Sequence, residues 1–81
     1  MLANDMKKGQ TGVLFTTGWK FRIEDNKKGN IRLATVWGFD TEMGSIYIHD
    51  IDSVDLPDGT TEPIELSKDQ QKKADLISRW I

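Results

Sequence analysis

Apolar and polar residues alternate along much of the first 56 positions, which is the period of β-strands with one buried face. The run FRIEDNKKGNIRL, residues 21–33, places two alternating stretches on either side of Asn26-Lys27-Lys28-Gly29. Asn at the first of these positions and Gly at the last are typical of a three-residue hairpin loop, because Asn caps the turn and Gly accepts a positive φ. The pattern therefore predicts a β-hairpin with Gly29 in the left-handed region.

The same alternation predicts the register of the hairpin. Placing Asn26 opposite Asn30 pairs apolar residues mainly with apolar residues and charged residues with their opposites. The resulting pairs are Glu24 with Arg32, Ile23 with Leu33, Phe21 with Thr35 and Trp19 with Trp37.

Shorter elements are predicted on both sides of this hairpin. They are a strand over about residues 11–16, a turn at Thr17-Gly18, a loop over 38–44, a strand over 45–49, a single helical or 3₁₀ turn over 50–52 and a short strand to Leu56. The turn Pro57-Asp58-Gly59 leads into a return strand. Pro63 confines that strand to a sheet edge, because proline cannot donate a ladder hydrogen bond.

The period becomes helical in residues 67–81. Ser67 is a good N-cap, and Gln70 completes a capping box three residues later. The apolar residues crowd into the last two turns, so packing on the barrel or on another chain must hold the helix. They are Ala74, Leu76, Ile77, Trp80 and Ile81.

Length and composition indicate one small domain. We expect a flexible N-terminus over 1–6, a barrel over 7–66 and a C-terminal helix over 67–81. The absence of cysteine excludes a disulfide framework and thiolate metal sites. The longest uncharged run, residues 9–19, is too short and too polar for a membrane span, which predicts a soluble cytoplasmic protein.

The net charge of −2 is distributed unevenly. Residues 1–39 carry a net +4, residues 40–66 carry −8 and residues 67–81 carry +2. Such asymmetry can steer a charged partner, although in a barrel the charges also neutralise one another across strands.

Short strands joined by tight turns predict a mainly β fold, a small five-stranded antiparallel barrel with a C-terminal α-helix. The stretches KKGQTGVLF, TTGWKFRIEDN and GSIYIHDIDSV resemble SH3-like barrels of the translation and KOW type, which close with a strand, a 3₁₀ turn and a final strand. The run DNKKGNIRLATVWGFDTEMGSIYIHDI also resembles small uncharacterised proteins of phages and environmental sequences. This resemblance covers roughly residues 6–55 and implies an accessory protein of a phage or mobile element.

The residues offer no catalytic template. There is one histidine, no cysteine, no G-x-S-x-G and no P-loop, so nucleophilic and phosphoryl-transfer sites lack their parts. His49, Asp50 and Asp52 match neither a calcium loop nor a zinc site. We therefore expect a non-enzymatic binding module without a cofactor or metal.

The resemblance implies a surface for a protein partner, because SH3-like grooves combine aromatic shelves with acidic loop residues. The matching residues are Trp37, Asp40, Glu42 and Tyr47. Trp80 must dock either on its own barrel or on another chain, and a homodimer with Trp80 in or beside the interface is predicted. Trp19 and Trp37 share one face in the predicted register, and at least one of them is expected to fill the barrel.

Basic residues beside aromatic ones give the alternative of nucleic-acid binding, which needs charge to displace counterions and rings to stack on bases. The candidates are Lys20, Arg22, Lys27, Lys28 and Arg32. Two lysines in a tight turn also keep the turn solvated, and this role has priority here. A second alternative is a structural, self-assembling subunit that uses the helix.

Overall fold

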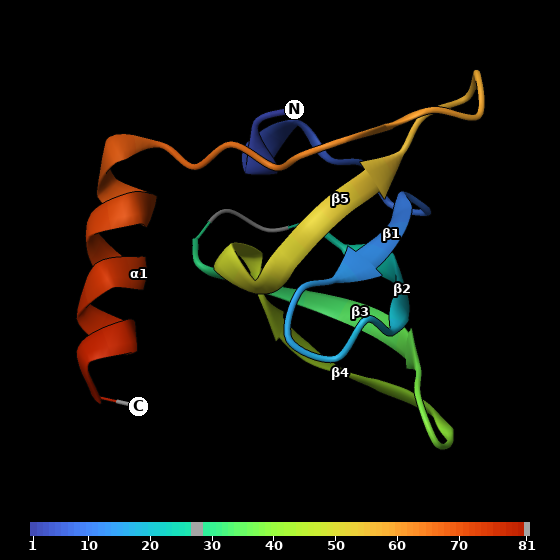
Figure 1. The fold of residues 1–81 in the computed structure, drawn as a ribbon, viewed down its shortest axis with the longest axis horizontal. Helices are drawn as coiled ribbons and strands as arrows, with labels where there is room; N and C mark the ends of the chain where they lie inside the picture. Colours follow the sequence, from blue (N-terminus) through green and yellow to red (C-terminus); the bar gives the residue numbers. More distant parts are fainter. Residues whose placement is uncertain (27–28, 81) are drawn as a thin grey trace.

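The computed structural model describes residues 1–26 and 29–80, and only the backbone of residues 78–80. An antiparallel sheet forms the body of the molecule, with one helix beside it (Figure 1). Its strands are β1 (Thr11–Leu14), β2 (Lys20–Asp25), β3 (Ile31–Trp37), β4 (Thr41–Tyr47), β5 (Ile51–Asp55) and β6 (Thr61–Glu62). The order is β4-β3-β2-β1-β5-β6, so the described strands form an open sheet with β4 and β6 at its edges. The mainly β prediction is confirmed, but the sheet has six strands, not five.

The hairpin of β2 and β3 is present, and Gly29 has φ +125°, as predicted. The predicted register is wrong by one residue, since Ile23 lies opposite Ala34 and Lys20 opposite Trp37. A bulge after Ile23 then sets Asp25 opposite Leu33. The reason is that the Arg32 side chain points into the protein and bonds to the hairpin loop instead of pairing with Glu24. Lys27 and Lys28 lie outside the described residues.

Strand β4 occupies half of the expected loop 38–44. It pairs with β3 along its whole length, from Trp37 opposite Thr41 to Ile31 opposite Tyr47. The ladder to β3 therefore outweighs the weak strand propensity of residues 41–44, which include Gly44. The 3₁₀ turn η2 (Ile48–Asp50) follows at once, slightly earlier than the expected 50–52.

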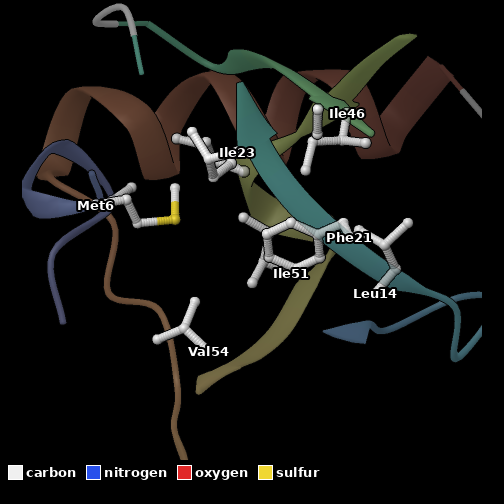
Figure 2. Close-up of a cluster of buried hydrophobic side chains, with 10 residues drawn as sticks. Met6, Leu14, Phe21, Ile23, Ile46, Ile51 and Val54 are labelled. Atoms are coloured by element: carbon white, nitrogen blue, oxygen red, sulfur yellow. The ribbon is translucent and has the colours of Figure 1, made fainter. Parts of the chain in front are cut away.

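The concave side of the sheet carries the hydrophobic core (Figure 2). Phe21 and Ile23 of β2 are completely buried at its centre, and Leu14, Ile46, Ile51, Val54 and Met6 surround them. Gly12 of β1 is needed for this packing, because a Cβ at that position would meet the Phe21 ring at 2.8 Å. Trp19 is half-buried and Trp37 is 40% exposed, so neither fills the core as expected.

The N-terminal segment is packed, unlike the flexible tail that we expected for residues 1–6. Ala3, in the short 3₁₀ turn η1 (Ala3–Asp5), and Met6 are both buried. The Met1 ammonium lies 2.5 Å from a carboxylate oxygen of Glu62. The Glu65 N–H donates to the Met1 carbonyl at 2.7 Å, and the Ala3 N–H donates to the Glu65 carbonyl at 3.0 Å. This segment therefore closes one end of the core.

The helix α1 (Lys68–Trp80) stands beside the sheet at the end of an extended segment (Figure 1). The capping box is confirmed: the Gln70 N–H donates to Ser67 Oγ at 3.2 Å and the Ser67 N–H to Gln70 Oε1 at 3.0 Å. Ala74 is buried, whereas Leu76 is 47% exposed. Among the described residues, no helix has the length and apolar character needed to cross a bilayer.

Candidate binding groove

Two adjoining hollows lie between β4 and the turn that joins β1 to β2. They share Trp19, Val36 and Glu42 in their walls. The first has a volume of about 220 Å³ and is completed by Gly38, Phe39 and Asp40. The second has a volume of about 280 Å³ and is completed by Leu14, Thr17, Gly44, Ser45, Ile46, Tyr47 and Asp50. We call the two hollows together the acidic groove.

Trp19 forms the wall between the two hollows because its neighbours hold it in place. The Thr17 hydroxyl accepts a hydrogen bond from the backbone N–H of Trp19 at 3.2 Å. The turn before it needs Gly18, which has φ +71° and donates its N–H to the Leu14 carbonyl at 2.9 Å. The indole also meets the Phe39 ring edge to face, with centroids 5.6 Å apart. Phe39 is 95% exposed, so its ring offers nearly all of its surface to a partner.

Acidic residues give the groove its charge. Asp40 and Glu42 line the first hollow, and Glu42 and Asp50 line the second. Among the described residues, no lysine or arginine lines either hollow. A groove with aromatic walls and only negative charges attracts a cationic ligand.

The far wall is fixed by Asp50 of η2. One Asp50 carboxylate oxygen accepts a hydrogen bond from the Thr16 N–H at 3.1 Å and another from the Thr16 hydroxyl. The Asp50 carbonyl accepts a hydrogen bond from the Phe15 N–H at 2.6 Å. These bonds tie η2 to the turn between β1 and β2, so both sides of the groove belong to one rigid frame.

Tyr47, at the end of β4, stacks on His49 with ring centroids 5.0 Å apart. The Nδ1 atom of His49 is buried and has no hydrogen-bond partner among the described residues. The imidazole therefore acts here as a flat support for Tyr47 beside the second hollow.

The predicted protein-binding residues separate into two groups. Asp40, Glu42 and Tyr47 line the groove, whereas Trp37 lies on the opposite face of β3, where the Arg22 guanidinium is 5.4 Å from its ring centroid. The Trp80 side chain lies outside the described residues. Our sequence reasoning left Trp19 out of the predicted site, because a large aromatic residue in so small a domain was expected to fill the barrel. An aromatic residue directly after a turn glycine was the available signal.

The basic residues considered for nucleic acid have other partners where the structure describes them. Lys20 lies 3.4 Å from an Asp55 carboxylate oxygen, and Arg22 Nε donates to Glu24 at 2.7 Å. Arg32 is 1% exposed and cannot reach a phosphate, so this candidate was wrong. Lys27 and Lys28 lie outside the described residues.

Arg32 instead joins the hairpin loop to the N-terminal segment, and Gln70 of α1 bonds to the same acceptors. Its Nη1 donates to the Gly29 carbonyl at 2.8 Å, its Nη2 to Asn4 Oδ1 at 2.9 Å, and its Nε to Asn26 Oδ1. Gln70 Nε2 donates to the same Asn4 Oδ1 at 3.0 Å and the same Gly29 carbonyl at 3.3 Å. Burial lowers the pKa of Arg32, but a guanidinium remains charged at neutral pH. We call Arg32, Asn4, Asn26, Gly29 and Gln70 the Arg32 cluster.

Among the described residues, no group of three or more carboxylate, imidazole or thiolate side chains is arranged to hold a metal ion. The acidic groove is thus the strongest candidate site. Comparison with family models, curated proteins and solved structures finds no match to this chain.

Proposed function

We propose that this protein is a non-catalytic binding module with an SH3-like fold, whose acidic groove receives a basic, extended segment of a protein partner. The strand order β4-β3-β2-β1-β5 and the 3₁₀ turn between β4 and β5 support the fold. Of these two features, the 3₁₀ turn followed by a final strand is what the sequence resemblance implies. The same resemblance supports a role as an accessory protein of a phage or mobile element.

The observation that carries the proposed function is the composition of the groove. Trp19 and Phe39 supply flat apolar surfaces, and Asp40 and Glu42 lie at their margin with no basic residue beside them in the lining. Extended segments rich in Pro, Lys or Arg bind by placing apolar atoms on such rings and cations near such carboxylates. Because these carboxylates are near solvent, they contribute more to selection of the partner than to total affinity.

Titration of ¹⁵N-labelled protein with short peptides that contain Lys, Arg and Pro tests the proposal. We expect chemical-shift changes at the Trp19 indole N–H and at backbone amides of residues 38–42, with binding weakened by salt. Glu42→Gln should lower the affinity about two- to fivefold, the range of one exposed charge. Asp52→Asn is the matched control, because Asp52 is exposed on β5 outside the groove lining.

Equal losses in the two variants would mean that the net charge, not the groove, attracts the peptide. Titration with RNA and DNA oligonucleotides distinguishes the alternative function. Shifts confined to Lys20 and Arg22, with none around Trp19, would favour nucleic acid over a protein partner.

A further inference from the structure

The convex face of β3 and β4 carries a second surface, which adjoins the acidic groove at Ser45 and Tyr47. Side chains at alternate positions of these strands point away from the core, and the ladder places them in adjacent rows. Five large apolar side chains in these rows are between 40% and 65% exposed: Ile31, Leu33, Trp37, Met43 and Tyr47. We call this surface the convex strip.

The residues between these apolar side chains are uncharged. Thr35, Thr41 and Ser45 complete the two rows. The neighbouring strand β2 carries charged residues, Lys20, Arg22 and Glu24, which border the strip along β3. β4 forms the opposite border and is an edge strand without lysine, arginine or proline. Edge strands of soluble proteins usually carry such residues to prevent association, and β4 lacks these protections.

We propose that the convex strip is the interface of a homodimer, in which the β3–β4 faces of two copies pack against each other. At 40% to 65% exposure, five such side chains present on the order of 500 Å². Two copies would together bury about 1,000 Å² of apolar surface, and a polar rim brings this into the range of about 1,200–2,000 Å² for specific interfaces. A patch of about 500 Å² is as large as the largest apolar patch of a typical monomer, about 300–600 Å², and patches of this size are often functional.

Charge favours a second copy over an unrelated acidic or basic partner. Each copy has a net charge of −2, so an interface containing the acidic residues would repel itself. The convex strip is neutral, and a two-fold axis uses the same patch twice. A shallow hollow of about 260 Å³, lined by Asp25 of β2 together with Ile31, Leu33 and Ser45, can receive a side chain from the opposing copy against its apolar residues. Met43, the most exposed member of the strip, is long and flexible enough to fill it.

The dimer also leaves the first hollow of the acidic groove open, although Ser45 and Tyr47 of the convex rows line the second hollow. Val36 and Glu42, which line the groove, face the concave side, whereas Leu33 and Met43 alternate with them on the convex side. Each dimer would therefore present two grooves, one on each outer side. A partner with two basic segments would then bind more tightly than a partner with one, through increased effective concentration.

Sedimentation equilibrium of the full chain, from about 1 to about 200 µM, tests this interface. We expect a species of twice the chain mass of 9.2 kDa that dissociates on dilution. Met43→Lys and Ile31→Lys each place a charge in the strip and should raise the dimer Kd at least tenfold. Both side chains are more than half exposed in one copy, so the fold should persist, as far-UV circular dichroism would verify.

Matched controls place the same charge on other exposed apolar residues. Phe15→Lys, in the turn after β1, and Leu76→Lys, on α1, should leave the dimer Kd unchanged. A wild-type chain that stays at 9.2 kDa up to about 200 µM would overturn the proposal. It would also be overturned if Leu76→Lys dissociated the dimer and Met43→Lys did not, which would assign the interface to α1.

Discussion

The indole of Trp19 lies against the backbone of Gly38, so close that a Cβ atom at position 38 would come within 2.6 Å of the indole Cε3. Trp19 directly precedes β2 and Gly38 directly follows β3, so this contact joins the start of β2 to the end of β3. The wall of the acidic groove therefore depends on the absence of a side chain at position 38.

Gly38→Ala tests this dependence. The added methyl group would force the indole to move, so we expect a shifted Trp19 indole resonance, weaker peptide binding and a loss of about 1–3 kcal/mol of unfolding free energy. Gly44→Ala is the control in the same groove, because a Cβ there meets no atom within 4 Å. Its unfolding free energy should change by less than about 0.5 kcal/mol. Similar losses in both variants, measured by urea unfolding, would contradict this account.

Arg32→Met tests the Arg32 cluster. The apolar side chain fits the site but leaves the Gly29 carbonyl and the Asn4 and Asn26 side chains without this donor. We expect a loss of about 2–4 kcal/mol of unfolding free energy, since buried polar groups without partners are costly. Arg22→Met, on the exposed face of β2, is the control and should cost no more than about 1 kcal/mol. If Arg32→Met had the same unfolding free energy as the wild type, the Arg32 cluster would not be needed for stability.

Gln70→Ala tests how the helix is attached. Gln70 caps α1 through Ser67 and also donates to Asn4 and the Gly29 carbonyl, whereas Gln71 bonds only within the helix, to Asp75. We expect Gln70→Ala to cost about 1–2 kcal/mol and to speed amide hydrogen exchange throughout α1. In Gln71→Ala the exchange should remain close to that of the wild type. Identical exchange in the two variants would mean that the contacts of Gln70 do not hold the helix.

Acid should destabilise the protein through Asp55. The Thr11 hydroxyl, and secondly the Lys20 ammonium, lower the pKa of Asp55 from its ordinary value of 3.8. A pKa that is lower in the folded state stabilises that state above the ordinary value, and this contribution disappears as the pH falls through the folded pKa. We therefore expect the unfolding free energy to decrease as the pH falls below about 4, and less steeply in Asp55→Asn. Urea unfolding of the wild type and of Asp55→Asn at several pH values measures this slope, and equal slopes in the two proteins would contradict this account.

Local features of this fold could be predicted from the sequence where a single residue type determines the backbone conformation or its hydrogen bonding. Gly29 at a positive φ, the Ser67–Gln70 capping box and the edge position of the strand before Pro63 all follow from local chemistry. Each of these features is determined by residues that are close in sequence, so it can be predicted from a short stretch of the chain.

The register of β2 and β3 could not be predicted in the same way. Arg32 was assigned to the exposed face because a charged residue rarely lies in a core. Its partner Asn4 is 28 residues away, and Gln70, which donates to the same Asn4 side chain, lies 66 residues from Asn4, so no local pattern shows that these residues converge. The error placed Trp19 and Trp37 on one face, whereas the structure places them on opposite faces, because a shift of one residue moves side chains to the other face. Asp40 and Glu42 both line the groove, Asp40 from the connection after β3 and Glu42 from β4.

The contacts of the N-terminal segment with residues 62–70 determine when the fold can be completed. Met1 meets Glu62 and Pro63, and Asn4 meets Gln70, so these residues bond to partners more than 60 positions later in the sequence. Ala3 and Met6 cannot be fixed over the core until that distant segment has emerged and the long intervening loop has closed. Contacts of such large sequence separation slow folding. During synthesis, β1 to β5 would therefore form a sheet with one end of its core still exposed, and the docking of the N-terminal segment against residues 62–70 would be the step that seals it.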